Sequence, residues 1–186
     1  DPSEGLKNIS KQIVSYQRED GIPLSGTLYL PEGFRPGIDA PLPLILWAYP
    51  QEFKSADAAG QMNTSPNAYI RVGASSVVFY STQGYAVLDN ASFPIVGEGE
   101  TEPNDSFIDQ LILNASSAID KMVEMKVADP SRVAVSGHSY GAFMTANLLS
   151  HCDLFAAGIA RSGAYNRTLT PFGFQGEERS YWNTPA

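Results

Sequence analysis

The chain has 186 residues, a mass of 20.1 kDa, 43% hydrophobic residues and a formal net charge of −8. This length suits one domain of roughly 100–200 residues. The acidic balance excludes nucleic-acid binding, which needs clustered lysine and arginine, and no apolar run approaches the roughly 20 residues of a membrane span. The single cysteine, Cys152, excludes an intrachain disulfide framework and a zinc site built from cysteines.

The apolar pattern predicts strands that alternate with helices. In chain order, the expected strands are Gln12–Gln17, Leu24–Leu30, Leu44–Tyr49, Tyr85–Leu88, Arg132–Ser136 and Phe155–Ala160, and the expected helices are Phe107–Val123 and Gly141–His151. The first two strands should pair antiparallel near a sheet edge, and the last strand is expected to be buried. The sequence therefore predicts an α/β fold with a mostly parallel sheet and flanking helices.

The helix expected over Phe107–Val123 has the strongest periodic signal. Its apolar residues recur with a period of 3.6 residues over more than four turns. Ser106 and Asp109 are placed to form a start that resembles a capping box, and Pro130 bars continuation at the far end. The segment 67–83 remains ambiguous between helix and strand.

The chemistry is carried by a G-x-S-x-G motif, Gly137-His138-Ser139-Tyr140-Gly141. It stands between a predicted strand and a predicted helix, where a nucleophilic serine is raised on a sharp turn above the carboxyl edge of the sheet. The helix N-terminus then faces the negative charge that develops during acyl transfer. We therefore predict that Ser139 is a nucleophile, the alternative being a surface serine in a glycine-rich connection.

An oxyanion hole needs two donors, of which the N–H of Tyr140 would be the first. The second donor usually follows an earlier strand, but here that position leads into Pro50, which has no N–H. The chain also lacks a His-Gly-Gly-Gly stretch of the lipase kind. The phenol of Tyr49 or a nearby N–H is left for this role, the alternative being that Tyr49 only packs.

Residues 133–144, VAVSGHSYGAFM, resemble the nucleophile region of the prolyl oligopeptidase family of serine peptidases. Residues 158–174 are similar to its glutamyl endopeptidase branch, and the likeness extends to residues 47–50 and 94–99. The resemblance implies an α/β-hydrolase catalytic domain that acts on peptides without a metal or organic cofactor, normally preceded by a β-propeller that filters substrates by size. It also implies that Tyr49 supplies the second oxyanion donor.

Two arginines are candidates for substrate selection. The resemblance places Arg167 where relatives that cut after proline carry an aromatic residue, in a segment that lines the pocket for the residue before the cut. A guanidinium there suits a glutamate side chain, which it can bind through two hydrogen bonds. Arg161 is a second candidate, and the alternative for Arg167 is a local ion pair with Glu177 or Glu178, or simple solvation.

A serine nucleophile also needs a histidine base and a carboxylate to orient it, in the chain order Ser, Asp or Glu, His. The chain has two histidines: His138 lies in the turn itself, and His151 should lie about 18 Å along the following helix at 1.5 Å per residue. Asp153 is the first acid after Ser139, but it precedes a strand instead of following a later one. We therefore expect the triad Asp and His to lie outside this chain.

On this interpretation, residues 1–186 form part of a catalytic domain, without its propeller and C-terminal end, and the chain as it stands is inactive. The alternatives are another acyl hydrolase, such as an esterase or lipase, and a non-catalytic fragment, because a fold alone does not fix a substrate. The sequence leaves localisation and oligomeric state open.

The substitution Arg167→Ala tests the specificity hypothesis. In a complete enzyme it should depress kcat/KM for cleavage after Glu more than after other residues, because only a glutamate loses its charged partner. Equal losses for all substrates would refute the role of Arg167.

Overall fold

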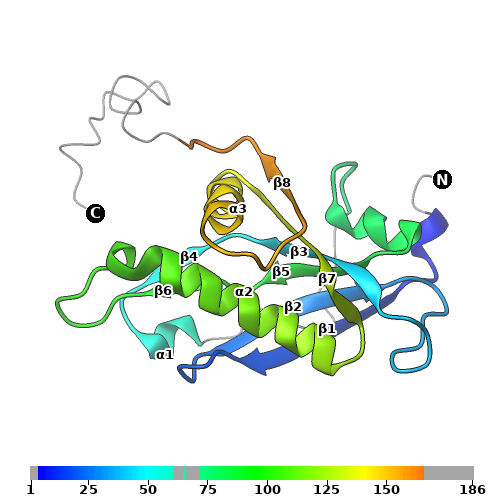
Figure 1. Cartoon of the computed structure of the whole chain (residues 1–186), viewed down its shortest axis with the longest axis horizontal. Coiled ribbons are helices and arrows are strands. Elements are labelled where there is room, and N and C mark those ends of the chain that lie inside the picture. The colour runs from blue at the N-terminus through cyan, green and yellow to red at the C-terminus, as the bar shows by residue number, and fades with distance from the viewer. Residues whose placement is uncertain (1–3, 61–64, 66–71, 166–186) are drawn as a thin grey trace.

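The computed structural model describes residues 4–60, 65 and 72–165. A six-stranded sheet with the strand order β1-β2-β5-β3-β7-β8 runs through this part of the chain (Figure 1). Its strands are β1 (Ser10–Gln17), β2 (Pro23–Leu30), β3 (Leu42–Ala48), β5 (Ala86–Ala91), β7 (Ala128–His138) and β8 (Ala157–Arg161). A separate two-stranded sheet pairs β4 (Gln51–Phe53) with β6 (Pro94–Val96).

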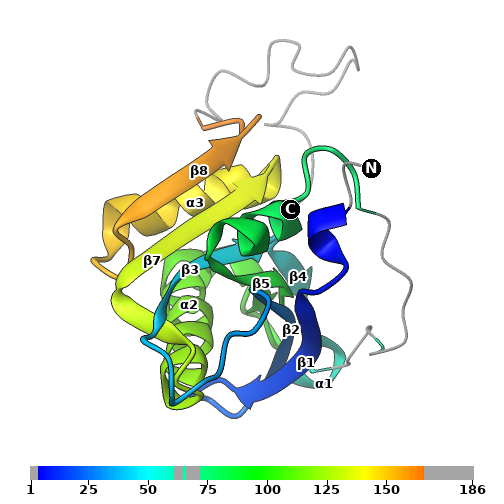
Figure 2. The ribbon, with the colours of Figure 1, turned by 90° about the vertical axis from the view of Figure 1, so that its right-hand side faces the viewer.

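Helices cover both faces of the large sheet. The α-helices are α1 (Ala56–Ala59), α2 (Phe107–Glu124) and α3 (Tyr140–His151), and the 3₁₀ helices are η1 (Glu4–Leu6), η2 (Val77–Gln83) and η3 (Pro103–Ser106). Figure 2 shows α2 and α3 on one side of the sheet, with η1 and η2 on the other. Within the described ranges, none of the helices has the length and apolar character needed to cross a membrane.

The strand pairing confirms the predicted α/β fold. β1 and β2 pair antiparallel from Ser10 opposite Leu30 to Gln17 opposite Pro23, and β2 pairs antiparallel with β5. From β5 onward, β3, β7 and β8 run parallel to one another. The carboxyl ends of these parallel strands therefore meet at one edge of the sheet, which is where α/β proteins place their sites.

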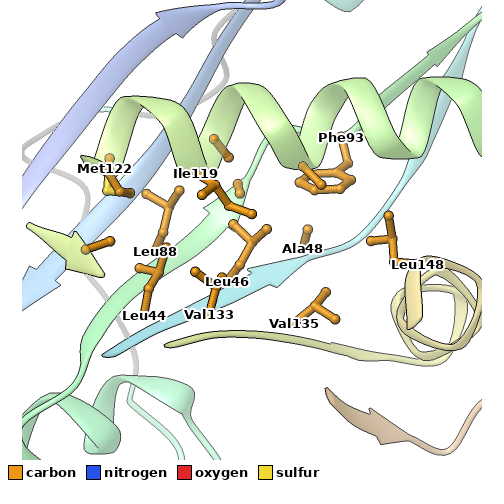
Figure 3. Close-up of a cluster of buried hydrophobic side chains, with 14 of the residues drawn as sticks. Leu44, Leu46, Ala48, Leu88, Phe93, Ile119, Met122, Val133, Val135 and Leu148 are labelled. Atoms are coloured by element: carbon orange, nitrogen blue, oxygen red, sulfur yellow. The ribbon is translucent and has the colours of Figure 1, made fainter. Parts of the chain in front are cut away.

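The core lies between the sheet and α2. Because side chains alternate along a strand, Leu44, Leu46 and Ala48 of β3 all point toward the helix side, where Ile119 and Met122 of α2 meet them (Figure 3). The intervening Ile45 packs on the opposite face in a cluster with Val77 and Val78 of η2. The near-continuous apolar run of β3 follows from this burial on both faces.

Two local expectations were wrong. Strand β8 is mostly exposed, because in the described part of the chain it is an edge strand with only β7 beside it. Ser106 makes no side-chain cap on α2. Its hydroxyl instead accepts a hydrogen bond of 2.8 Å from Gln110, and the capping box is formed one turn earlier by Glu102 and Asp105 on η3.

The ambiguous segment also resolves in part. Its last residues form η2, which begins after the N-cap Ser76 and ends at Gly84, whose φ of 87° suits a residue without a Cβ. Residues 67–71 of the segment lie outside the described residues.

A buried guanidinium joins the β1–β2 turn to α2 and β6. The Arg18 side chain, which is 3% exposed as a residue, forms a bidentate ion pair with Asp20 at 2.8 and 2.6 Å. It also donates to the Pro94 carbonyl at 3.1 Å, to Asn114 at 3.0 Å and to Gln110 at 3.2 Å. The hydrogen bond from Arg18 lowers the pKa of Asp20. These contacts fix the positions of β6 and α2 relative to the β1–β2 turn.

The substitution Arg18→Ala should lower the free energy of unfolding by about 3–5 kcal/mol, because it strands the buried acceptors of this network. Chemical denaturation of the full-length protein measures the loss. The control is Arg35→Ala, which removes an exposed ion pair with Asp39 and should cost less than about 1 kcal/mol. A loss no larger for Arg18→Ala than for the control would contradict a role of this network in stability.

Candidate active site

Ser139 occupies a sharp turn between β7 and α3, at the carboxyl edge of the sheet. Its φ of 57° and ψ of −112° lie outside the helical and extended regions, and a positive φ is strained for a residue with a side chain. The Ser139 N–H donates to the Arg161 carbonyl at 2.9 Å, and its own carbonyl accepts from Ala142 and Phe143 at 3.0 and 3.1 Å. Backbone bonds on both sides therefore hold the serine in its strained conformation, with the residue exposed.

The two glycines of the motif allow this turn to close. A Cβ on Gly137 would lie 2.4 Å from the carbonyl carbon and oxygen of Gly141, and a Cβ on Gly141 would lie 2.5 Å from the Ala48 oxygen. Both distances are shorter than any real Cβ contact, so neither position accepts a side chain without backbone movement. The nucleophile turn is thus packed directly against the end of β3.

This packing brings Tyr49 beside the turn. The same Cβ on Gly141 would lie 3.7 Å from the Tyr49 Cα. After Pro50 the chain enters β4, where the Gln51 N–H donates to the Phe93 carbonyl at 3.1 Å. The backbone of Tyr49 is thereby held between β3 and β4. Its side chain is exposed, with 52% of the residue accessible.

The Tyr140 side chain joins several elements around the turn. Its hydroxyl donates to the Glu52 carboxylate of β4 at 2.7 Å. Its ring stacks on Phe107 at a centroid distance of 5.7 Å and on Phe143 at 6.1 Å, and it meets the Tyr49 ring edge to face at 6.0 Å and 75°. The backbone N–H of Tyr140, at the N-terminus of α3, is the predicted first oxyanion donor.

Arg161 ends β8 opposite His138 of β7, so it lies at the same edge as Ser139. Its guanidinium donates to the Ser75 carbonyl at 3.1 Å and lies 5.9 Å from the centre of the Trp47 ring. Arg161 therefore already has contacts within the chain. Arg167, the other predicted substrate-binding residue, lies outside the described residues.

Comparison with known proteins shows which family shares this sequence. The sequence profile of the prolyl oligopeptidase family matches residues 109–182. The chain is 53% identical over 182 residues to a probable glutamyl endopeptidase, chloroplastic, of Arabidopsis thaliana, and the alignment covers 97% of this chain and 19% of that protein. The chain belongs to the prolyl oligopeptidase family.

Solved structures support the α/β-hydrolase fold of this family member. A post-proline cleaving enzyme from Rickettsia typhi superposes with a TM-score of 0.56 at 17% identity, over 84% of this chain and 21% of that one. An acetyl xylan esterase from Paenibacillus sp. R4 gives a TM-score of 0.56 at 20% identity, over 83% of this chain and 49% of that one. The chain spans about a fifth of the length of the Arabidopsis thaliana relative described above.

The two histidines of this prolyl oligopeptidase family chain lie at opposite ends of the nucleophile turn and the helix that follows it. His151 is the last of the 12 residues of α3, and its Nδ1 lies 2.8 Å from the Asn147 carbonyl oxygen. His138 is the last residue of β7 and is exposed beside the turn. The described ranges also hold no group of three or more His, Cys, Asp or Glu side chains suited to a metal ion.

Sequence reasoning missed Glu52. It lies 88 positions before Tyr140, in a short strand that carries no motif, and only the folded chain brings the two together. The available signal was weak: Gln51-Glu52-Phe53 follows Tyr49 closely, and residues just after a strand end are often near a site.

The substitution Gly141→Ala tests the packing of the nucleophile turn on β3. Its Cβ must displace the backbone at Ala48, so we expect a loss of about 2–3 kcal/mol in unfolding free energy together with reduced labelling of Ser139 by a serine-directed probe. The control is Gly73→Ala, where a Cβ has nothing within 4 Å and both readouts should stay unchanged. Equal behaviour of the two variants would count against the close approach.

Proposed function

We propose that the protein is a serine peptidase in which Ser139 forms an acyl-enzyme with the carbonyl carbon of a peptide bond. The observation that carries the proposal is the strained, exposed Ser139 between β7 and α3. A conformation that costs about 1–3 kcal/mol persists where surrounding structure enforces it, and such strain concentrates at functional sites. The identity to a probable glutamyl endopeptidase supports a peptide substrate.

In the proposed reaction, the Ser139 hydroxyl attacks the carbonyl carbon and the carbonyl oxygen becomes an oxyanion. The N–H of Tyr140 and the phenol of Tyr49 donate to that oxygen, and the N-terminal end of α3 adds a favourable field. Collapse of the tetrahedral intermediate breaks the C–N bond and releases the amine. Water then attacks the acyl-enzyme and regenerates the serine.

The proton of Ser139 must pass to a general base and then to the leaving amine. In the chain order Ser, Asp or Glu, His, the base follows the nucleophile, whereas His138 precedes Ser139 and His151 lies at the far end of α3. We therefore assign the base and its carboxylate partner to parts of the protein outside these 186 residues, together with the propeller. The relative of 53% identity is about five times as long as the matched segment, which leaves room for all of them.

We further propose that the peptidase prefers cleavage after Glu. The name of the relative supports this preference, and two arginines are candidates to bind the carboxylate: Arg161, at the end of β8, and Arg167, six positions later in the sequence. A guanidinium binds a carboxylate through two parallel hydrogen bonds, which gives both charge and shape selectivity.

Labelling with a fluorophosphonate tests the proposal in the protein expressed from its complete coding sequence. We expect Ser139 to be labelled, and Ser139→Ala to abolish labelling and lower kcat on a Glu-containing peptide by about 10⁶-fold, as for loss of a serine nucleophile. The matched control is Ser150→Ala, which changes an exposed serine at the other end of α3. This variant should keep both the labelling of Ser139 and the cleavage of the peptide.

A comparison of peptide and ester substrates distinguishes a peptidase from an esterase. Peptides should be cut with a higher kcat/KM than short acyl esters of the same acyl group. A preference for the esters would favour a non-peptidase acyl hydrolase, and absence of labelling in the complete protein would overturn the catalytic role of Ser139.

A further inference from the structure

We propose that Glu52 is a positioning residue for the oxyanion hole, acting through the Tyr140 ring to hold the phenol of Tyr49 in place. This inference rests on the proposed function, because it assigns a support to the second oxyanion donor. The juxtaposition that carries it is a carboxylate, a hydroxyl and two aromatic rings contributed by β4, α3 and the end of β3.

The first step concerns how Glu52 is aimed. β4 pairs in parallel with β6, with Glu52 opposite Ile95, and the Gly97 N–H donates to the Phe53 carbonyl at 2.9 Å. Side chains alternate along a strand, so the faces of Phe53 and Glu52 differ. Phe53 packs in the cluster of Ile22, Leu24 and Ala59, and Glu52 points to the other side, where its carboxylate accepts from the Tyr140 hydroxyl.

The second step concerns how firmly the Tyr140 ring is held. Phe107 lies at an interplanar angle of 21° to it and Phe143 at 15°, so the ring is stacked against both α2 and α3. Stacking fixes the plane of the ring but leaves sliding within the plane less restricted. The hydrogen bond of 2.7 Å to Glu52 fixes the outer end of the ring, and a bond to an ionised acceptor is about twice as strong as a neutral one.

The third step links this ring to Tyr49. The Tyr49 side chain is largely exposed, so burial does little to restrict its rotamer. The Tyr49 ring meets the Tyr140 ring edge to face, and such pairs contribute about 0.5–1.5 kcal/mol. An oxyanion donor must lie 2.7–3.1 Å from the developing charge, so a displaced Tyr140 ring would release Tyr49 and weaken the donor.

A double-mutant cycle in the full-length protein tests this path. Glu52→Ala should lower kcat about 10-fold with KM within about twofold, because a positioning defect acts on the transition state. Tyr140→Phe, which keeps the ring and removes only the hydroxyl, should give a similar loss. Glu52→Gln should restore most of kcat, since its amide oxygen still accepts from the phenol.

The decisive arm is the background Tyr49→Phe. If Glu52 acts through the Tyr49 phenol, Glu52→Ala in that background should cause no further loss in kcat, so the two effects are not additive. The matched control is Glu124→Ala, which removes an exposed glutamate paired with Lys121 at 2.9 Å and should leave kcat unchanged. Thermal unfolding of each variant shows whether it is folded, and Tyr140→Phe carries the test if Glu52→Ala is not.

The outcomes separate this inference from the function it rests on. Full activity of Glu52→Ala and Tyr140→Phe alongside an impaired Tyr49→Phe overturns the role of Glu52 alone. An equal loss from Glu52→Ala in both backgrounds overturns it too, because Glu52 would then act independently of Tyr49. Full activity of Tyr49→Phe overturns both the oxyanion role of Tyr49 and its support by Glu52, whereas an unlabelled Ser139 overturns the peptidase itself.

Discussion

The candidate site depends on one close approach, that of the nucleophile turn to the end of β3. Gly141 lies so near the Ala48 carbonyl that only a hydrogen fits between them, and Gly137 is equally close to Gly141. With both flanks of the turn compressed, Ser139 is left with a positive φ and an exposed side chain. The same approach places Tyr49 beside the turn that carries the serine, so one packing contact positions both the turn and the proposed oxyanion donor.

The rest of the fold stabilises that edge of the sheet from outside. The parallel order β5-β3-β7-β8 aligns the strand ends, and the Arg18 network ties α2 and β6 to the β1–β2 turn. β6 in turn pairs with β4, which carries Glu52. The hydrogen bond from Arg18 to Pro94, 76 positions away in the sequence, therefore supports the small sheet that holds Glu52. The aromatic rings of Phe107, Tyr140 and Phe143 complete this support between α2 and α3.

Signals that are local in the chain were recovered from the sequence. The helix predicted at Phe107–Val123 is observed as Phe107–Glu124, because its period is long and its apolar stripe is continuous. Burial was harder to predict: the run Phe155–Ala160 reads as a buried strand, but β8 has a neighbour on one side only in the described part of the chain. The cap at Ser106 also failed, since Gln110 competes for the same hydroxyl.

The sequence by itself determined the strand–turn–helix around Ser139, the order of the six main strands and the two long helices, and the family, because each rests on residues that are neighbours in the chain. Only the tertiary structure decided that Glu52 meets Tyr140, that Arg18 is buried and that the guanidinium of Arg161 is already held by Ser75 and Trp47. The partners in these contacts are separated by 76 positions, for Arg18 and Pro94, to 114 positions, for Arg161 and Trp47. The burial of Arg18 also depends on which elements cover its side chain. Contacts at such separations follow from how sheets and helices pack, and no short pattern in the chain encodes them.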